Sequence, residues 1–407
     1  MKNILQINTT FNIGGAAEIS KVIFDEINNR LNYRSYFAYG SGKDIAIKNI
    51  CKFSYKPELY FHALITRLTG YEGRGSYFST KRLMKYIESN NIDLIHIHNI
   101  HGYYLNLNFI NYLKENEYPV VWTFHDPWPI TGSCAYITEC KRWKIGCGEC
   151  PHLEYYPKNY IDQSKNMWEK KNKLFSSGWK PVIITPSKWL ANEVKKSYLK
   201  DHEIKIINNG ININTFKPRS TKNIREKLNI PLNKKIILFV AADLQNERKG
   251  AKYFFDALKY LKNKNYIVVT IGKKYEKKFK NIDIEIKQLG YIYDREKLSE
   301  IYSMSDVFCT TSLDEVFGLT VTEALSSGTP VVAFDVGGIT EQIRGGCGFT
   351  VKPKNIKEIA QKIEILFKDE KLNEEMSKNA REKAVNNYSI EKMVNEYIKV
   401  YDKLLEG

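Results

Sequence analysis

The feature that most constrains the fold of this chain is a repeated unit, a short run of apolar and β-branched residues followed by a longer helical pattern. Each run is apolar at consecutive positions and is bounded by turn or helix signals. This is typical of a strand that is buried on both faces of a parallel sheet. Four such runs lie in the first half of the chain, at residues 3–8, 93–98, 119–124 and 181–185. They predict a parallel α/β domain.

The alternation restarts after a connecting stretch, residues 206–220, which is rich in Asn. Its strands are predicted at residues 235–240, 266–271, 306–311 and 330–334. We therefore expect an α/β fold of two Rossmann-like, doubly wound domains facing across a cleft, residues 1–212 and 213–386. A last amphipathic helix, residues 387–407, is predicted to pack back on the first domain. Open parallel sheets bind ligands beyond the carboxyl ends of their strands, so the site is expected there.

Length and net charge limit the kinds of function and partner that this chain can have. The chain has 407 residues and is 43% apolar, enough for two or three packed domains. Its formal net charge of +16 favours a polyanionic partner: nucleic acid, an anionic lipid surface or a phosphate-bearing substrate. No run reaches the roughly 18 apolar residues that span a bilayer, and the start has too short an apolar stretch for a signal peptide. The sequence thus predicts a cytoplasmic protein.

Two carboxylates stand in a glycine-punctuated, apolar stretch of the second half. Glu315 follows a predicted strand end, and Glu323 lies in the first turns of a predicted helix, Thr320 to Ser326. The helix start at Gly318 offers amides and a positive dipole end to a phosphate. Carboxylates beside a phosphate need neutral, donor-rich neighbours, and sugar hydroxyls fit this need. Spacing alone also allows Glu315 to be a helix cap and Glu323 a surface residue.

Three features of the first half are also candidates. Gly14–Gly15 follow a strand and precede a helix, which suits either close approach of an anion or a tight turn. His125 directly follows a strand, at the edge where ligands bind. His96 and His98 alternate on one strand, so both point to the same face. We interpret this pair as core or cleft-lining residues and not as metal ligands.

The segment with the two glutamates resembles the E-x7-E signature of retaining glycosyltransferases of family 4, which have the GT-B fold. Further family motifs occur in order, as NIGGAAE, DLIHIHN, TFHD, ITPSKWL, NNGININTFKP and RKG. Together they cover nearly the whole chain. The stretch WTFHDPWPITGSC, with the cysteines after it, resembles most the colanic-acid-type branch, enzymes of surface-polysaccharide synthesis.

The resemblance implies a metal-independent, retaining transferase. It would move a hexosyl residue from a UDP- or GDP-sugar to a glycan or polyprenyl-linked acceptor, at the inner face of the cytoplasmic membrane. The acceptor hydroxyl would attack from the front face and give its proton to the departing phosphate. The protein's part would be positioning and stabilisation of the leaving diphosphate.

The resemblance also assigns roles. Glu323 would bind the ribose hydroxyls and Glu315 would face the sugar ring. Lys249 would neutralise the diphosphate, and His125 would approach the sugar and the leaving phosphate. The other donor-side residues are Gly14, Gly15, Arg248, Gly290, Tyr291, Ile292, Phe317, Gly318, Leu319 and Thr320, with backbone amides offered by Gly318 and Leu319. The acceptor side would comprise His98, Asn99, Asp126 and Trp128.

One position departs from the family pattern. Family members commonly carry Gly-Arg after the first strand of the second domain, and this chain has Ala242 and Asp243 there. Arg248 is the nearest substitute, but its side chain is expected to point away from that of its neighbour. We therefore expect Lys249 alone to carry most of the charge compensation.

Four of the seven cysteines fall in one window: Cys134, Cys140, Cys147 and Cys150. In a cytoplasmic chain such a cluster favours metal over disulfides. Only the second pair has the C-x2-C spacing typical of zinc sites. A structural zinc and free thiols packed under a loop both fit. A closed four-thiolate site would take no part in chemistry, so no cofactor is expected for catalysis.

Residues 55–86 mix aromatic, leucine and basic residues, which suits either an anionic bilayer surface or packing into the first domain. Two rival functions are a GT-B-like sugar-nucleotide epimerase or phosphorylase, and a basic nucleic-acid-binding protein with a four-cysteine module. The second would need a localised basic face with stacking aromatics, and the motif order provides no known module of that kind.

Overall fold

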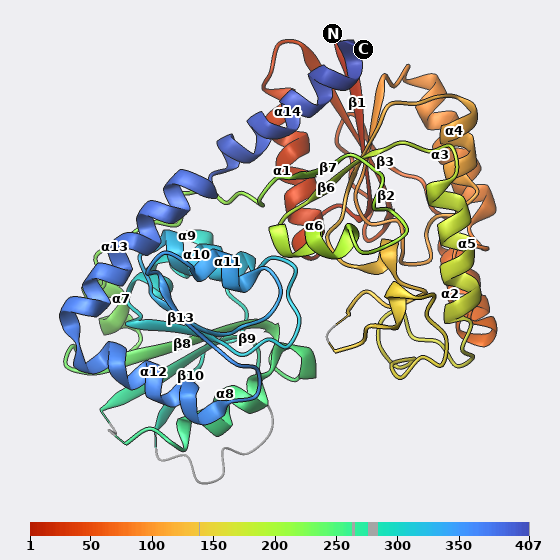
Figure 1. The fold of residues 1–407 in the computed structure, drawn as a ribbon. Helices are drawn as coiled ribbons and strands as arrows, with labels where there is room; N and C mark the ends of the chain where they lie inside the picture. Colours follow the sequence, from red (N-terminus) through yellow and green to blue (C-terminus); the bar gives the residue numbers. More distant parts are fainter. Residues whose placement is uncertain (138, 263–264, 276–283, 407) are drawn as a thin grey trace. The chain divides into compact units, whose positions relative to one another are not determined.

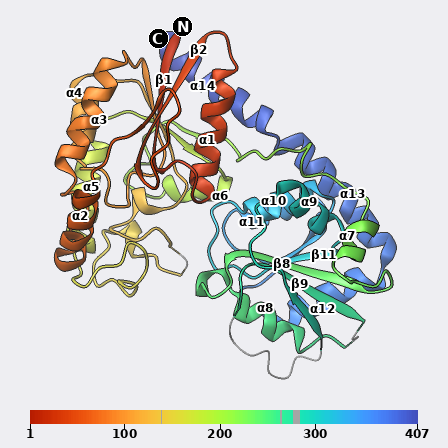
Figure 2. The same cartoon turned by 180° about the vertical axis from the view of Figure 1, so that it is seen from behind.

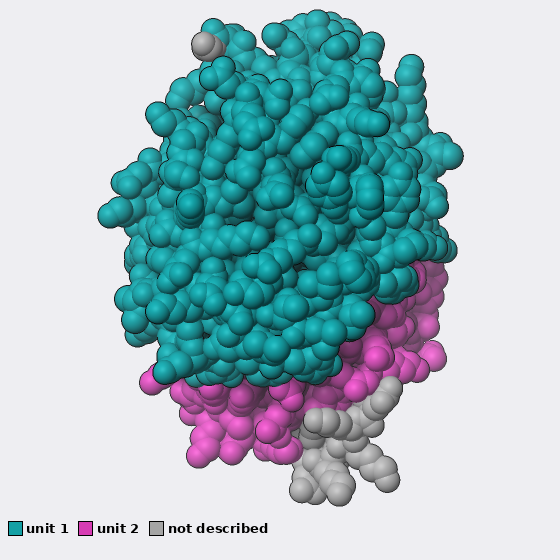
Figure 3. Space-filling model, turned by 90° about the vertical axis from the view of Figure 1, so that its right-hand side faces the viewer, with its two compact units in different colours: residues 1–208, 393–407 teal, residues 209–392 magenta. Residues whose placement is uncertain are grey.

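The computed structural model describes residues 1–137, 139–262, 265–275 and 284–406 (Figure 1; Figure 2 from behind). The chain forms two compact units, which Figure 3 colours separately. Unit 1 consists of residues 1–208 and 393–407, and unit 2 consists of residues 209–392.

Unit 1 is built on a seven-stranded sheet whose strands all run parallel, in the order β3-β2-β1-β4-β5-β6-β7. Its strands are β1 (Lys2–Thr10), β2 (Tyr33–Ser41), β3 (Ile50–Lys52), β4 (Leu94–Ile97), β5 (Val120–Thr123), β6 (Val182–Thr185) and β7 (Ile204–Ile206). Its helices are α1 (Gly15–Asn28), α2 (Lys56–Thr69), α3 (Tyr77–Ser89), α4 (Phe109–Glu115), α5 (Ser164–Ser176) and α6 (Lys188–Val194), with short 3-10 turns at Trp128–Ile130 and Arg142–Lys144.

Unit 2 repeats this plan with six parallel strands in the order β10-β9-β8-β11-β12-β13. Its strands are β8 (Lys235–Asp243), β9 (Tyr266–Lys273), β10 (Glu285–Gln288), β11 (Val307–Thr310), β12 (Val331–Phe334) and β13 (Gly348–Val351). Its helices are α7 (Lys222–Lys227), α8 (Ala251–Leu258), α9 (Arg295–Ser303), α10 (Leu319–Ser326), α11 (Ile339–Ile343), α12 (Ile356–Lys368) and α13 (Glu370–Asn387), with a 3-10 turn at Glu247–Lys249.

The central strand of unit 2 shows why these strands are apolar at consecutive positions. Ile236 and Leu238 of β8 pack into one core, which also holds residues of α9 and α10. Ile237 and Phe239 pack into a second core with residues of α8 and α12. Successive side chains of a strand point to opposite faces, so a sheet covered on both sides needs apolar residues at every position. The predicted doubly wound α/β fold is confirmed.

The eight predicted strands correspond to β1, β4, β5, β6, β8, β9, β11 and β12, with ends that differ by up to three residues. The strands β2, β3, β7, β10 and β13 were not predicted from the sequence. The last four are the edge strands of the two sheets and are only partly buried, so polar residues or glycine interrupt their apolar runs. The nine-residue β2 is buried but reads YRSYFAYGS, in which tyrosine, serine and glycine replace β-branched residues.

The last helix, α14 (Ile390–Glu406), packs on the sheet of unit 1 through buried tyrosines. The Tyr401 hydroxyl lies 2.7 Å from His96 Nδ1 and accepts a weak hydrogen bond from Gln6 Nε2 at 3.4 Å. The Tyr397 hydroxyl lies 3.0 Å from Thr123 Oγ1, which also contacts His96 Nε2 at 2.8 Å. This buried polar network joins the C-terminal helix to β1, β4 and β5.

We predict that Tyr401→Phe lowers the free energy of unfolding of unit 1 by about 1–3 kcal/mol, because it leaves buried His96 and Gln6 groups without a partner. All six tryptophans lie between residues 122 and 189, so tryptophan fluorescence during urea unfolding reports on unit 1 alone. Tyr60→Phe, at an exposed tyrosine of unit 1, is the control and should change the value by less than about 0.5 kcal/mol. Equal stability of the Tyr401 variant and the wild type would contradict the anchoring role.

Candidate active site

In unit 2, the loop after β11 carries Glu315 into the middle of a charged cluster. Its carboxylate forms a short ion pair with Lys249 Nζ and accepts a hydrogen bond from Ser312 Oγ at 3.2 Å. Arg248 Nη1 lies 3.5 Å from the same carboxylate oxygen. Burial alone would raise the pKa of Glu315, but the charges of Lys249 and Arg248 outweigh it and the pKa lies below its usual value. Glu315 is therefore ionised at neutral pH.

The expectation that Arg248 points away from Lys249 is wrong. Both side chains lie on the same carboxylate, and Arg248 also donates to the Asp314 carbonyl at 2.7 Å. The loop after β11 supplies both of these partners, so contacts that are distant in sequence set the direction of Arg248. The turn itself ends at Gly250, which has a left-handed conformation (φ 69°) and lies so close to Thr311 that a Cβ atom would be 1.9 Å from its carbonyl oxygen. Two cations thus meet one carboxylate.

Glu323, on α10, is only 5% exposed, so it is not a surface residue. Its Oε1 accepts from Arg295 Nη1 at 2.8 Å and its Oε2 accepts from the Tyr302 hydroxyl at 2.9 Å. A carboxylate offers about four lone-pair sites. The two contacts engage one oxygen each and fix the plane of the carboxylate.

The start of α10 differs from expectation at two residues. The Gly318 amide donates to Gln342 Oε1 at 3.0 Å, so in this structure it is not offered to a diphosphate. The Phe317 side chain is buried and packs edge-on against Tyr388, which excludes it from donor contact. The amides of Leu319 and Thr320 belong to the first helical turn, where N–H groups have no partner within the helix.

Three of the predicted donor-side residues follow β10: Gly290, Tyr291 and Ile292. Gly290 has a positive φ of 71°, and its carbonyl accepts from the Gly272 amide at 2.9 Å. Tyr291 and Tyr293 are both exposed and stack on each other, with ring centroids 6.1 Å apart. Ile292 packs against the core of unit 2. Two exposed aromatic rings thus follow the edge strand β10.

In unit 1, His125 is the second residue after the end of β5 and is half-buried. Its Nε2 lies 2.8 Å from His98 Nδ1, and His98 Nε2 lies 2.8 Å from Gln6 Oε1. Burial lowers the pKa of His125 to about 4, although the nearby Asp126 charge opposes this shift. At neutral pH His125 is uncharged and can exchange hydrogen bonds with hydroxyls.

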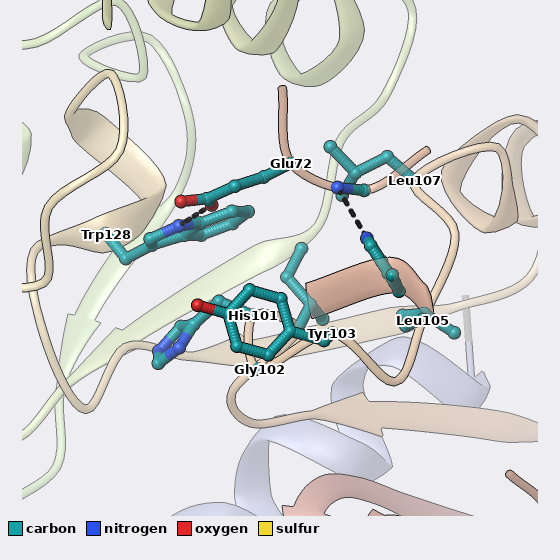
Figure 4. Close-up of a pocket in the computed structure, with 10 residues that line it drawn as sticks. Glu72, His101, Gly102, Tyr103, Leu105, Leu107 and Trp128 are labelled. Atoms are coloured by element: carbon teal, nitrogen blue, oxygen red, sulfur yellow. Dashed lines mark hydrogen bonds between the residues drawn. The ribbon is translucent and has the colours of Figure 1, made fainter. Parts of the chain in front are cut away.

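Two of the predicted acceptor-side residues are buried and cannot touch an acceptor. His98 is 0% exposed and lies between Gln6 and His125. Trp128 is 1% exposed, and its buried Nε1 donates to Glu72 Oε2 at 2.6 Å (Figure 4). The structure thus places both residues behind the site surface and not on it.

Asp126 and Asn99 remain partly exposed. The Asp126 carboxylate accepts from His101 Nε2 at 2.8 Å and from the Trp128 amide at 2.9 Å. Burial would raise the pKa of Asp126, but His101 and the hydrogen bonds lower it further than burial raises it. The Asn99 carbonyl accepts from the Tyr104 hydroxyl at 2.5 Å. Both residues are held rigidly at the carboxyl edge of the sheet.

Gly14 and Gly15 are exposed at the N-terminus of α1, in the short connection that follows β1. Gly14 has φ 90°, a conformation that disfavours any other residue, and nothing lies within 4 Å of the place where its Cβ would be. The glycine is therefore required by the turn and leaves open space beside the helix start.

Sequence analysis missed the buried charges behind Asp126. Lys171 of α5 donates to the carbonyls of Trp128 (2.9 Å) and Thr131 (3.2 Å) and lies 3.3 Å from the centre of the Trp128 ring. Burial lowers the pKa of Lys171 to about 8, against the opposing charge of Glu72. A cavity of about 10 Å³ next to Glu72, His101 and Trp128 has room for about one water (Figure 4). No pattern signals these residues, because each is a single polar residue in an ordinary helix or loop.

The four cysteines of the predicted metal site are free thiols of intermediate burial. Burial raises the pKa of Cys134, Cys147 and Cys150, and neighbouring thiols of the group contribute to each shift. The Gly132 amide donates to Cys147 Sγ at 3.2 Å. Within the described ranges, no three His, Cys, Asp or Glu side chains are placed to hold a metal ion. The structural zinc stays a prediction.

Among the described residues, no helix has the length and apolar character needed to cross a membrane.

Comparisons with known proteins identify the family of this chain. Residues 46–215 match the model of Glycosyltransferase Family 4, and residues 220–383 match that of Glycosyl transferases group 1. A protein of Escherichia coli K12 that carries the name colanic acid biosynthesis glycosyl transferase WcaC is 27% identical, over 99% of this chain and 100% of its own length. An α-1,3-N-acetylgalactosaminyltransferase of Campylobacter jejuni, named for a diphospho-undecaprenol acceptor, is 30% identical over 51% of this chain and 57% of its own.

Solved structures with the same fold cover the whole chain. Sucrose-phosphate synthase from Thermosynechococcus elongatus has a TM-score of 0.76 at 18% identity, covering 100% of both chains. HepE of Anabaena, solved with UDP-glucose, has a TM-score of 0.70 at 16% identity, covering 99% of this chain and 100% of its own. With the two family models matching one unit each, this chain belongs to the family 4 glycosyltransferases and has the GT-B fold.

Proposed function

We propose that this protein is a retaining glycosyltransferase that moves a hexosyl residue from a UDP- or GDP-sugar to a glycan or polyprenyl-linked acceptor. Its pathway would be synthesis of a bacterial surface polysaccharide such as capsule, O-antigen or exopolysaccharide. The observation that carries the proposal is the arrangement at α10, where ionised Glu315 meets two cations and buried Glu323 is held by Arg295 and Tyr302.

The nucleotide would bind through its ribose and diphosphate. Glu323 would accept hydrogen bonds from the ribose hydroxyls, each worth roughly 1.5–3 kcal/mol because the acceptor is charged. Lys249 and Arg248 would face the diphosphate together with the amides of Leu319 and Thr320. Lys249 and Arg248 both lie against Glu315, and their positive charges suit an anionic diphosphate leaving group.

The chemical step would need no protein nucleophile. The bond between the sugar's anomeric carbon and the diphosphate oxygen breaks while the acceptor oxygen bonds to the same face of the anomeric carbon. The acceptor proton passes to the departing phosphate oxygen. Cations and helix amides that are already in place stabilise the developing negative charge, so no divalent metal is needed for this role. His125, uncharged at neutral pH, would hydrogen-bond to hydroxyls of the transferred sugar.

Names of related proteins support the choice of substrates. HepE was solved with UDP-glucose and with UDP. The Campylobacter relative and an Escherichia coli α-1,3-galactosyltransferase are named for diphospho-undecaprenol acceptors. An acceptor of that kind would place the enzyme in the cytoplasm at the inner face of the membrane. We also retain a structural zinc on the four cysteines as a proposal, to be tested by the metal content of purified, reduced protein.

A panel of UDP-, GDP- and ADP-sugars tests the function. We expect one nucleotide family to raise the unfolding midpoint, because a ligand at 100 times its Kd adds about 2.7 kcal/mol of stability. That family should also release nucleotide only when acceptor is present. An epimerised sugar nucleotide formed without acceptor, or release that requires inorganic phosphate, would favour the rival reactions. No stabilisation by any member of the panel would contradict the proposal.

The two glutamates should differ in their effects. We expect Glu323→Gln to weaken nucleotide binding about tenfold or more and to remove the preference for the ribonucleotide over its 2′-deoxy form, since the variant loses the charged acceptor. Glu315→Gln should chiefly lower kcat, with a smaller change in nucleotide affinity. Isothermal titration of both nucleotide forms, with steady-state rates, measures both. An unchanged ribose preference in Glu323→Gln would reject its assignment.

The two cations should act on the phosphates. We expect Lys249→Ala and Arg248→Ala each to reduce affinity for the nucleoside diphosphate about tenfold or more, and to leave affinity for the free nucleoside unchanged. Lys252→Ala removes an exposed lysine three residues from Lys249 and is the matched control. If only the Lys249 variant loses diphosphate affinity, Lys249 alone carries the role. If neither variant does, the cluster is structural.

A further inference from the structure

The helix α2 is oriented with its polar residues toward the protein and its apolar residues toward solvent. The side chains that it buries are His62 and Thr66. Tyr60, Phe61, Leu64 and Leu68 are 76%, 61%, 54% and 54% exposed. At 100° per residue these four lie within one arc of about 100° on the helix surface. A surface helix of a globular protein normally shows the opposite pattern.

Polar contacts hold the two buried residues of α2. His62 Nε2 accepts from the Gly73 amide at 3.0 Å, and His62 Nδ1 lies 3.1 Å from Ser76 Oγ. Thr66 Oγ1 donates to the Tyr71 carbonyl at 3.3 Å. Other apolar residues of α2 are partly buried, namely Leu59, Ala63 and Ile65. The expectation that the apolar residues of this stretch pack into the first domain is therefore wrong for the four exposed residues, which form an apolar stripe open to another partner.

Neighbouring segments extend this stripe. Two backbone amides at the start of α3, Phe78 and Ser79, donate to the Glu58 carboxylate at 2.9 and 2.7 Å, which fixes exposed aromatic residues beside α2. At the other end, the Tyr160 amide donates to the Arg67 carbonyl at 3.1 Å. The α2 patch is defined by eight exposed side chains: Tyr60, Phe61, Leu64, Leu68, Tyr77, Phe78, Tyr160 and Ile161. Figure 1 shows α2 at the outside of unit 1.

The α2 patch is bordered by exposed cations. Lys81 lies over the Tyr77 ring at 4.7 Å, Arg82 over the Tyr55 ring at 5.5 Å and Lys158 over the Tyr160 ring at 5.6 Å. Further exposed cations at this border are Lys56 and Arg67 of α2. The one acidic residue in the sequence of α2 is Glu58, and its charge is engaged by the α3 amides. Exposed cations thus lie next to the aromatic residues of the patch and on α2 itself.

We propose that the α2 patch docks on an anionic phospholipid bilayer. Apolar side chains of an interfacial helix enter about 5–10 Å into the boundary between headgroups and acyl chains, and tyrosine rings prefer this boundary. Each Lys or Arg near an anionic surface contributes to binding. A protein partner is disfavoured, because protein interfaces are depleted in lysine and this border is rich in it. The inference rests on the proposed function only in that a polyprenyl-linked acceptor would lie in the same bilayer.

Vesicle flotation of the full chain tests the proposal. We expect the wild type to bind vesicles of phosphatidylcholine with about 30% phosphatidylglycerol, to bind pure phosphatidylcholine much less, and to lose binding as salt rises. Phe61→Ser with Leu64→Ser, and separately Lys81→Glu with Arg82→Glu, should each reduce binding tenfold or more. Matched controls are Leu232→Ser, at an exposed leucine of unit 2, and Lys180→Glu with Lys200→Glu, at exposed lysines of unit 1; both should bind as the wild type does.

The remaining outcomes overturn the proposal. The first is that the protein floats with no vesicle, and the second is that the patch variants float as the wild type does. The third is that the wild type binds no vesicles and is a dimer that the patch variants convert to a monomer, which would make the patch a protein interface. Nucleotide-induced stabilisation is measured on the same variants and should match the wild type, because α2 is outside the donor cluster. A protein that binds vesicles but no sugar nucleotide would reject the transferase and keep the docking surface.

Discussion

The constraint on which this structure depends is the parallel direction of all strands in both sheets. In a parallel sheet every strand ends at the same edge, so the loops that follow the strands gather there. The loop after β1 carries Gly14, the loop after β5 carries His125, and the loop after β11 carries Glu315. Residues far apart in sequence thereby meet within each unit without any local sequence signal.

A second layer of buried polar groups fixes these edge residues. Arg295 and Tyr302 hold Glu323, and His101 holds Asp126. Such groups are costly to bury unless every partner is in place, so they restrict each carboxylate to one geometry. The same reasoning explains why several predicted contact residues are buried. The polar side chains at the surface of a site are supported by other polar side chains that are buried beneath them.

The strands that are apolar on both faces could be predicted from the sequence. Burial on two faces requires consecutive apolar residues, a pattern that loops do not show. The edge strands could not be predicted, since they are only partly buried and polar residues or glycine interrupt their apolar runs. At the site, Glu315, Glu323, Lys249 and His125 were found by spacing and motif order. The direction of Arg248 was missed because it depends on contacts with the distant loop after β11. The burial of His98 and Trp128 was missed because a motif does not show which of its side chains are buried.

The contact between His98 and His125 shows how buried polar residues determine the hydrogen-bonding state of a residue at the site. Gln6 Nε2 donates to Tyr401, so Gln6 Oε1 is the atom that accepts from His98 Nε2. His98 is neutral because burial lowers its pKa, and its Nδ1 then carries the lone pair. His125 Nε2 must therefore donate to His98 Nδ1, which leaves the lone pair of His125 on Nδ1. With the tautomer assigned from this network, His125 offers an acceptor nitrogen to hydroxyl donors, and the C-terminal helix that supplies Tyr401 takes part in setting that state.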